Sequence, residues 1–324
     1  MQKMTYREAI VAAQRDALAN NSDIIIMGED IGEPGSPFKT TQGLYEEFGK
    51  DRVRDTPISE NAFVGAALGM AITGYRPIVE LMFSDFMAVC FDQIVNSIAK
   101  HRFMCGGHVD VPLVIRAMGG GGVRFGAQHS QTGETWLFPF PGLKVYCPAT
   151  PSDAYHMLKA AVDDVNPVVI LEHKALMSSS GMVDTDTDSA NSIHGPEVML
   201  EGSDVTIVAS LAMVNRSLEA AEKLQEEGIS AEVINIRVLR PLDTRLILDS
   251  LKKTGAILTV EENHQCGGWG AEVISQVLTQ GFDYIETPPG RITLPDWPMP
   301  HSPPLEDNTI PSSDKIISAV KQML

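Results

Sequence analysis

The sequence predicts an α/β protein built from two doubly wound units. Short apolar runs, typical of buried parallel strands, alternate with amphipathic helical patterns, and this order implies right-handed crossovers. The 324 residues exceed the usual size of one hydrophobic core. Between about 177 and 201 the periodicity is lost and Ser, Asp, Thr and Gly accumulate. We therefore expect a first domain at 1–176, a linker at 177–201 and a second domain at 202–324.

Several local signals define the elements of the first domain. Thr5-Tyr6-Arg7-Glu8 is a capping box that opens a helix. Buried-type strands are expected at 24–27, 76–83, 112–116 and 168–171. Further helices are expected from Ser59, from Ser84 to about Arg102, and from Ser152.

The second domain repeats the alternation of strands and helices. Strands are expected at 205–209, 232–236 and 256–260, and helices at 214–225, 241–252, from about 269 and from about 313. Glu261-Glu262-Asn263-His264 is expected just beyond the carboxyl end of the third strand. A Pro-rich stretch, 295–304, precedes the final helix.

Composition and charge exclude several classes of partner. The chain is 44% hydrophobic and carries a formal net charge of −17, which argues against nucleic acids and anionic membranes because both are polyanions. No basic segment followed by an apolar run opens the sequence, and no apolar stretch reaches about 18 residues. We expect neither secretion nor membrane insertion. The four cysteines lack metal-ligand spacing, so reduced thiols in a cytoplasmic protein are expected.

The stretch 57–70 is the first candidate functional segment. Ser59 has the side chain of a helix N-cap, and Glu60 follows in the first turn, where the helix dipole favours a carboxylate. Small residues at three- and four-residue spacing leave one face nearly bare, so a helix, a second subunit or a flat ligand can approach: Ala62, Gly65, Ala66 and Gly69. The alternative is a capping acid on a core helix.

Two further segments follow predicted strands. Glu29 and Asp30 come directly after the strand 24–27, at the end where open parallel sheets bind ligands. The alternative there is a solvated loop. Four consecutive glycines, 119–122, precede His129, and such a run either lets backbone approach a ligand closely or forms a mobile loop.

These segments and two others together resemble a known family. The residues that carry the resemblance are Gly28-Glu29-Asp30, Ile58-Ser59-Glu60-Asn61, Asp85-Phe86, Gln128-His129-Ser130-Gln131 and Pro141-Gly142-Leu143-Lys144-Val145. Over essentially its whole length the chain resembles the beta subunit of the thiamine-diphosphate-dependent dehydrogenase component of 2-oxo acid dehydrogenase complexes. The resemblance implies a pyrimidine-binding domain, a transketolase-type C-terminal domain, an α2β2 heterotetramer with an alpha subunit, and a lipoyl-bearing dihydrolipoyl acyltransferase core.

The resemblance also implies roles for individual residues. Glu60 matches the carboxylate that bonds the aminopyrimidine of thiamine diphosphate and activates the cofactor. Glu29 and Ile58 would line the same pocket, and Phe86 would offer an aromatic face, its alternative being core packing. His129 matches a histidine near the reactive carbon and the lipoyl entrance, where imidazole can assist reductive acylation. As an isolated residue, His129 would be an ordinary loop histidine.

The resemblance implies two metal ions whose ligands lie on different chains. No Gly-Asp-Gly occurs in the sequence, so the magnesium ligands and the diphosphate contacts are expected on the alpha subunit. Some relatives carry a potassium site, and oxygen ligands suit such a cation. The matching positions are Leu113, Ala161, Val162, Asp164 and Asn166. The segment 161–167 could equally be an ordinary helix-to-strand turn.

The predicted function is oxidative decarboxylation of a 2-oxo acid, of the pyruvate type, with acyl transfer to a lipoyl domain. Acetoin cleavage and branched-chain 2-oxo acid oxidation are the alternatives within the resemblance. A second hypothesis is that the chain is half of a split transketolase or deoxyxylulose-phosphate synthase. Such an enzyme would need phosphate-binding basic residues at the entrance to the substrate site. A third hypothesis is a docking scaffold whose catalytic site has been lost, but the presence of Glu60 and His129 argues against it. His264 is a weaker candidate for an interface or entrance role.

Overall fold

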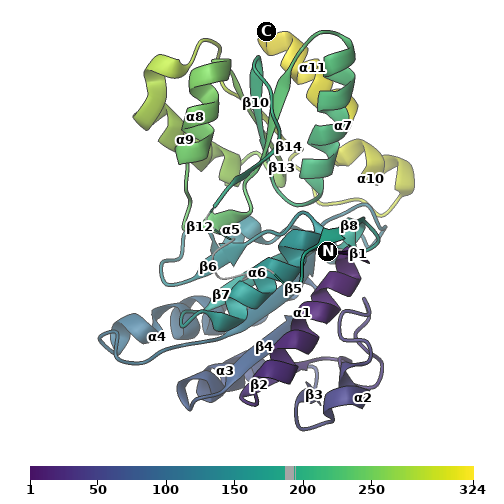
Figure 1. The fold of residues 1–324 in the computed structure, drawn as a ribbon, viewed down its shortest axis with the longest axis vertical. Helices are drawn as coiled ribbons and strands as arrows, with labels where there is room; N and C mark the ends of the chain where they lie inside the picture. The colour runs from purple at the N-terminus through teal and green to yellow at the C-terminus, as the bar shows by residue number, and fades with distance from the viewer. Residues whose placement is uncertain (187–192, 194) are drawn as a thin grey trace.

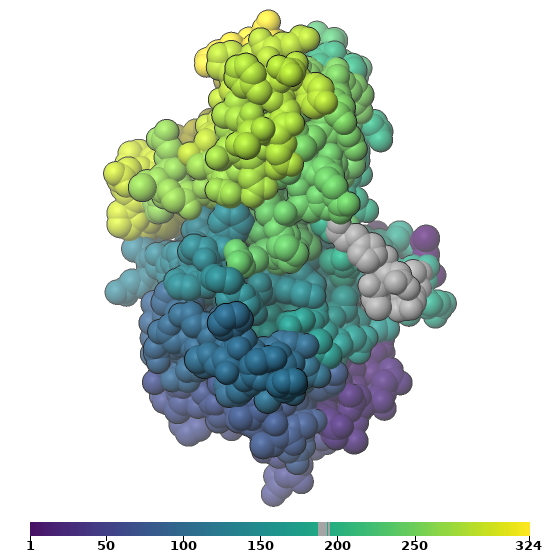
Figure 2. Space-filling model, turned by 90° about the vertical axis from the view of Figure 1, so that its left-hand side faces the viewer, coloured from purple at the N-terminus to yellow at the C-terminus, as the bar shows by residue number. Residues whose placement is uncertain are grey.

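Two mostly parallel sheets, one in each half of the chain, form the framework of the structure (Figure 1). The computed structural model describes residues 1–186, 193 and 195–324; the middle of the expected linker, 187–192 and 194, lies outside these described residues. We call residues 1–186 the first unit and residues 195–324 the second unit. Figure 2 shows the second unit, green to yellow, seated on the first.

The first sheet has seven strands in the order β12-β6-β7-β5-β4-β2-β3. Their bounds are Ile24–Gly28 for β2, Val53–Asp55 for β3, Arg76–Leu81 for β4, Val114–Gly119 for β5, Lys144–Tyr146 for β6, Val168–His173 for β7 and Val238–Arg240 for β12. All neighbours run parallel except β12, which is antiparallel to β6. The four strands that the sequence predicts in this half are therefore confirmed.

Helices cover both faces of the first sheet, because successive residues of a strand point to opposite sides. Ile78 packs in the cluster with α1 and α6, whereas Val79 packs in the cluster with α3. The helices are α1 Tyr6–Asn20, α2 Leu44–Phe48, α3 Glu60–Ile72, α4 Ala99–Met104, α5 Glu134–Leu137 and α6 Pro151–Asp163. The capping box at Thr5 is confirmed, and α6 opens with a second one at Thr150. This two-sided arrangement confirms the doubly wound fold.

The continuous helix expected from Ser84 to about Arg102 is wrong. A 3₁₀ turn, η1 Ser84–Ala88, comes first, and the helical segment beyond it contains π-helical turns, η2 Gln93–Ile98, before α4. The hydroxyl of Ser84 donates to the backbone oxygen of Gln131 at 2.8 Å, and Gln131 Nε2 donates to Asp85 Oδ1 at 2.8 Å. These distant bonds orient the first turn, and no local signal in the sequence reports them.

The expected linker contains two short strands. β8, Ser180–Val183, pairs antiparallel with β1, Gln2–Thr5, to form a separate two-stranded sheet. β9, Glu197–Leu200, pairs antiparallel with β11 at the edge of the second sheet. Both strands are mostly exposed and lack the apolar alternation that marks a buried strand, which is why the sequence pattern missed them.

The second sheet has five strands in the order β14-β13-β10-β11-β9. The strands are β10 Val205–Ala209, β11 Ala231–Asn235, β13 Ile257–His264 and β14 Gly290–Leu294, and the helices are α7 Ala212–Glu226, α8 Arg245–Thr254, α9 Trp269–Gly281, α10 Pro303–Thr309 and α11 Ser313–Met323. Two single 3₁₀ turns, η3 Lys174–Leu176 and η5 Phe282–Tyr284, complete the assignment. Glu261–His264, expected beyond the strand, form the last four residues of β13.

The two units are joined by more than the connecting segment. β12 lies in the sequence of the second unit but pairs with β6 at the edge of the first sheet. A cluster of buried apolar side chains runs through both, from Val145 on β6 to Leu239 on β12 and Trp269 on α9. Within the described ranges, no helix is long and apolar enough to cross a membrane.

Candidate active site

Four neighbouring strands of the first sheet end at one edge, and each is followed by polar or aromatic residues. β7, β5, β4 and β2 are adjacent and parallel, so their carboxyl ends lie together. Glu29 follows β2, the turn η1 follows β4, the glycine run follows β5, and Lys174 follows β7. Because ligands of open parallel sheets bind beyond these ends, this edge is the candidate site.

Glu60 opens α3 beside this edge. It is the first residue of the helix, where the helix dipole favours a carboxylate, and it is only 7% exposed. Ser59 occupies the N-cap position, but its side chain makes no capping hydrogen bond, and the expected hydroxyl cap is wrong. Ile58, two residues earlier, is 86% exposed.

Glu29 and Glu60 form a pair of interacting carboxylates. Burial raises the pKa of Glu29, and the nearby carboxylates of Glu60 and Asp30 raise it further, whereas a hydrogen bond from the backbone of Ser59 opposes them. Oε1 of Glu29 is buried and has no hydrogen-bond partner among the described residues. A buried carboxylate oxygen without a partner is costly, so this atom is available to accept a hydrogen bond from a ligand.

Cys90 links this acid pair to the aromatic side of the site. Burial raises the pKa of the Cys90 thiol to about 12, and the Glu60 carboxylate contributes to the rise. The thiol also contacts the backbone oxygen of Phe86, at 3.7 Å from sulfur to oxygen. Glu60 and the backbone of Phe86 are therefore both near this buried thiol.

His129 lies against two aromatic rings. Its imidazole packs edge-to-face on Phe83 at 4.8 Å and on Phe86 at 5.4 Å between ring centroids. Lys174 Nζ donates to the backbone oxygen of His129 at 2.7 Å and lies 5.3 Å from the centroid of Phe83. Burial lowers the pKa of Lys174 to about 8. His129 is thus held from its ring and from its main chain.

The structure brings together most of the predicted site residues and adds others. Glu29 interacts electrostatically with Glu60, Phe86 contacts His129, and Cys90 is near both Glu60 and the backbone of Phe86. The sequence reasoning missed Lys174 as a site residue. The available signal was its position three residues after the predicted strand 168–171, at the carboxyl edge of the sheet.

Four of the five residues proposed for potassium lie elsewhere, in the last turn of α6 or between α6 and β7, and the fifth, Leu113, directly precedes β5. Their oxygens do not fit a metal ion. Arg76 Nη1 donates to the backbone oxygen of Val162 at 2.6 Å and to that of Asp164 at 3.2 Å. Lys144 Nζ donates to Asp164 Oδ2, while Asn166 donates to Oδ1. Two cationic side chains already occupy these oxygens, so the ordinary-turn alternative describes this segment.

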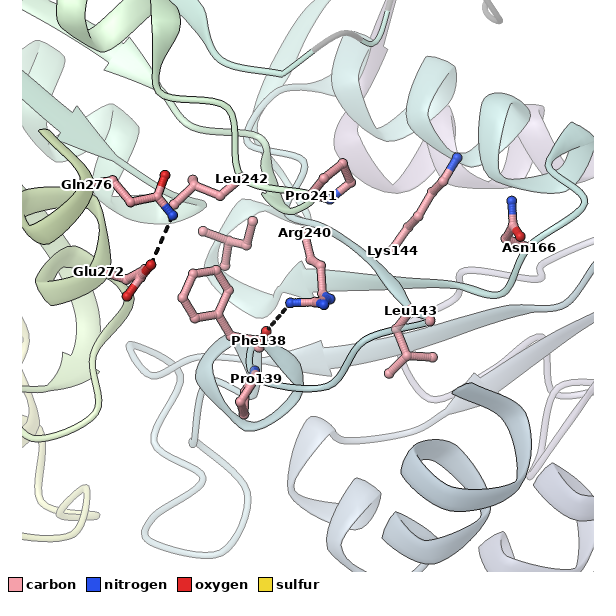
Figure 3. Close-up of a pocket in the computed structure, with 12 residues that line it drawn as sticks. Phe138, Pro139, Leu143, Lys144, Asn166, Arg240, Pro241, Leu242, Glu272 and Gln276 are labelled. Carbon is pink, nitrogen blue, oxygen red and sulfur yellow. Dashed lines mark hydrogen bonds between the residues drawn. The ribbon is translucent and has the colours of Figure 1, made fainter. Parts of the chain in front are cut away.

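The other two members of that set give no better support for a cation. The backbone oxygen of Leu113 accepts a bond from the amide of Val168 at 2.9 Å, and Ala161 lies inside α6. A cleft of about 670 Å³ lies between the units, and Lys144 and Asn166 line one end of it (Figure 3). In the same cleft, Arg240 donates a hydrogen bond to the backbone oxygen of Phe138. The cleft is lined by none of Glu29, Glu60 or His129.

The residues at the sheet edge fit the pyrimidine end of thiamine diphosphate. Glu60 and Glu29 supply two carboxylates for a ring nitrogen and an amino group, one of them with an oxygen that has no partner in the described structure. Phe86, half-buried in η1, supplies an aromatic surface for a flat ring. In the part of the chain that the structure describes, no group of three or more His, Cys, Asp or Glu residues could hold a metal ion.

Comparisons with known proteins agree with this geometry. Residues 2–179 match the family described as the transketolase pyrimidine binding domain, and residues 196–316 match the transketolase C-terminal domain. The chain is 41% identical to the beta subunit of the pyruvate dehydrogenase E1 component of Saccharomyces cerevisiae, over 99% of this chain and 89% of that protein. It is 40% identical to the Rhizobium meliloti counterpart, over 99% of this chain and 70% of that protein.

Two other matches bear on the alternatives. The beta subunit of acetoin:2,6-dichlorophenolindophenol oxidoreductase from Bacillus subtilis is 40% identical, over 98% of this chain and 96% of that protein. Among solved structures, a split-gene transketolase in an inactive beta4 tetramer is similar with a TM-score of 0.79 and 26% identity, covering 99% and 98% of the two chains. These matches confirm the fold class and the resemblance inferred from the sequence.

Proposed function

Because this chain belongs to the family of transketolase-type beta subunits that includes those of the pyruvate dehydrogenase E1 component, we propose that it is the beta subunit of a thiamine-diphosphate-dependent, pyruvate-type 2-oxo acid dehydrogenase component. The observation that carries the proposal is the acid pair, Glu29 and Glu60, buried at the carboxyl edge of the first sheet beside Phe86 and His129. This pair, beside an aromatic surface, can hold an aminopyrimidine.

Each residue has a defined part in the proposed reaction. Thiamine diphosphate would supply a carbon nucleophile for the carbonyl of a 2-oxo acid and an electron sink for the loss of carbon dioxide. Glu60 holds or shares a proton at a pyrimidine ring nitrogen, and its place at the start of α3 keeps it fixed. Glu29 would accept a hydrogen bond from the cofactor at Oε1, which has no partner among the described residues. Phe86 covers one face of the ring.

His129 acts in the second half of the reaction. Its imidazole can donate a hydrogen bond or a proton to an acyl oxygen or to a sulfur of a lipoyl group. The edge-to-face contacts with Phe83 and Phe86 fix the plane of the ring, and the bond from Lys174 fixes the main chain. Positioning of this kind is worth more to catalysis than the acid strength of the group alone.

An alpha subunit completes the proposed enzyme. The outer face of α3 carries exposed small residues, among them Ala62, Ala66 and Gly69, and Ile58 is exposed beside it. Such a face lets a second chain approach closely beside Glu60. We infer an α2β2 heterotetramer in which the alpha subunit supplies magnesium and the diphosphate contacts, and a lipoyl-bearing acyltransferase core that receives the acyl group.

The test is to reconstitute the enzyme with its alpha subunit and replace Glu60. Glu60→Gln and Glu60→Ala should each lower turnover of pyruvate by about a hundredfold or more, the usual loss for a positioned proton-transfer group. Cofactor binding, followed by calorimetry, should require both chains. Unchanged turnover in both variants would remove the assignment of Glu60, and tight magnesium-dependent binding to the isolated chain would remove the proposed division of the cofactor.

Acetoin cleavage is the second candidate, favoured by the equal identity to the Bacillus subtilis beta subunit. Pyruvate, branched-chain 2-oxo acids and acetoin should therefore be assayed side by side. The transketolase alternative needs free basic residues for a sugar phosphate. Arg124 and Lys174, the basic side chains described beside the glycine run, are both already engaged, with Glu306 and with the main chain of His129. This engagement favours the dehydrogenase over the transketolase alternative.

A further inference from the structure

The glycine-rich segment after β5 is bound by acidic side chains from the second unit. We call residues 119–126 the glycine loop. The amide of Gly121 donates to Glu262 Oε1 at 2.6 Å, and the amide of Gly122 donates to Glu306 Oε1 at 2.7 Å. Arg124 Nη1 donates to Glu306 Oε2 at 2.6 Å. The first of these carboxylates lies on β13 and the second on α10, so two elements of the second unit hold one loop of the first.

Among the described residues, the side chain of Glu306 forms hydrogen bonds with this loop alone. Its side chain is completely buried, and besides Gly122 its carboxylate accepts from the backbone amide of Arg124 at 3.3 and 3.2 Å. Burial of a carboxylate is strongly unfavourable unless hydrogen bonds and an opposite charge compensate for it. The loop supplies both. Glu306 and the glycine loop are therefore fitted to one another.

The backbone of the loop needs such support from outside. Gly120, Gly122 and Arg124 all have positive φ, at +83°, +89° and +67°. A side chain at position 120 would overlap the His173 ring, since its Cβ would lie 1.9 Å from Nε2. Arg124 is not a glycine, so its left-handed conformation costs energy that its contacts must offset. Loss of these contacts to the second unit would leave the loop backbone free to adopt other conformations.

The path of the loop reaches His129 by two routes. Along the chain, the amide of His129 donates to the backbone oxygen of Gly126 at 3.4 Å, at the end of the loop. Through side chains, the ring of Phe125 packs on Phe83 at 5.6 Å, and Phe83 in turn packs on the imidazole of His129 at 4.8 Å. A displacement of the loop therefore moves both the main chain and the ring of His129.

We propose that Glu306 is a positioning residue for His129: by fixing the glycine loop, the second unit sets the geometry of the acyl-transfer group in the first. The inference rests on the proposed function of His129 in the second half-reaction. The second unit then has a part in catalysis although it contributes no residue to the acid pair that holds the cofactor. Glu306 acts through the amides of Gly122 and Arg124.

The experiment separates the two half-reactions in the enzyme reconstituted with its alpha subunit. Decarboxylation followed with an artificial electron acceptor depends on Glu60, whereas acyl transfer to a lipoyl domain depends also on His129. In Glu306→Ala, kcat for acyl transfer should fall about tenfold or more, as for a misplaced catalytic group, with decarboxylation nearly unchanged. Glu306→Gln keeps one acceptor oxygen and should lie between the wild type and Glu306→Ala. Amide hydrogen exchange at 119–126 should be slowest in the wild type, faster in Glu306→Gln and fastest in Glu306→Ala.

The matched control is Glu261→Gln. Glu261 is also fully buried in the second unit, and it also pairs with an arginine, Arg291, and accepts a glycine amide, that of Gly270, but both partners lie in its own unit. This variant should lose stability without a selective loss of acyl transfer or faster exchange of the glycine loop. Equal loss of both half-reactions in Glu306→Ala, or normal acyl transfer with a freely exchanging loop, overturns the inference.

A fourth variant keeps this inference separate from the proposed function. His129→Ala should itself slow acyl transfer and leave decarboxylation in place. If it does so and the Glu306 variants do not, the positioning role is wrong while the function of His129 stands. If His129→Ala changes neither half-reaction, the proposed function of His129 fails first, and exchange at 119–126 still reports whether Glu306 holds the loop.

Discussion

Lys174 Nζ donates a hydrogen bond of 2.7 Å to the backbone oxygen of His129, from a side chain that is only 5% exposed. The ammonium group thus lies beneath the segment that carries the imidazole, between the rings of Phe83 and Phe125, at 5.3 and 5.9 Å from their centroids. A buried cation that satisfies a main-chain oxygen fixes that oxygen, because loss of the contact leaves both groups without a partner.

Replacement of Lys174 should therefore impair the chemistry of His129. We expect Lys174→Met to lower kcat for acyl transfer by about tenfold, because it removes a charge-assisted bond worth about 1.5–3 kcal/mol. Lys174→Arg should recover part of the loss. Stopped-flow measurement of acyl transfer to a lipoyl domain checks this, and equal rates in Lys174→Met and the wild type would contradict it.

Glu134 should make the protein less stable as the pH rises. Burial raises the pKa of this carboxyl from 4.5 to about 7, and neither of its oxygens has a hydrogen-bond partner among the described residues. Below pH 4.5 both folded and unfolded chains hold the proton. Between pH 4.5 and 7 the unfolded chain ionises first, so stability falls through this window, by about 3 kcal/mol in total.

The variant Glu134→Gln isolates this effect. Its free energy of unfolding in urea should nearly equal that of the wild type near pH 4.5 and exceed it at pH 7.5, since the amide does not ionise. Glu222→Gln, at an exposed position on α7, is the control and should follow the wild type. A pH dependence that is the same in Glu134→Gln and the wild type would exclude the role of this carboxyl.

The four cysteines should differ sharply in reactivity. With a pKa of about 12, Cys90 is ionised in only about one molecule in ten thousand at pH 8, and Cys147 is fully buried with its pKa also raised by burial. Cys266 is exposed. A thiol reagent should therefore modify Cys266 of the isolated chain first, and the two buried thiols only on unfolding. Cys105 is half-buried, so a fast phase that persists when both Cys105 and Cys266 are replaced by Ser would disprove this order.

Stability should not depend on potassium. Arg76 and Lys144 already bind the oxygens of Val162 and Asp164. Burial raises the pKa of Asp164, but hydrogen bonds from Lys144 and Asn166, together with the charge of Lys144, lower it overall. Replacing KCl by choline chloride at equal ionic strength should leave the Tm unchanged. Lys144→Met should lower it by a few degrees, as for the loss of about 1 kcal/mol. A Tm of the wild-type protein that rises with potassium alone would restore the metal site.

Local patterns were sufficient for the central strands and for most of the longer helices. The apolar run at 24–27 and the capping box at Thr5 each specify an element through neighbouring residues, because burial on both faces and first-turn hydrogen bonds are decided within a few positions. Glu60 at a helix start is visible for the same reason. The π-helical turns at 93–98 and the edge strands β8 and β9 have no comparable local signal.

The sequence by itself determined the alternation of strands and helices, the resemblance to a family, and the residues at the ends of individual strands. Only the tertiary structure decided which of those ends meet, that Lys144 and Arg76 occupy the expected potassium site, and that Glu306 binds the glycine loop. Glu306 and Gly122 are 184 positions apart, and Arg76 and Val162 are 86 apart. Such contacts depend on how sheets and units pack, and no periodicity along the chain encodes a distance between segments so widely separated.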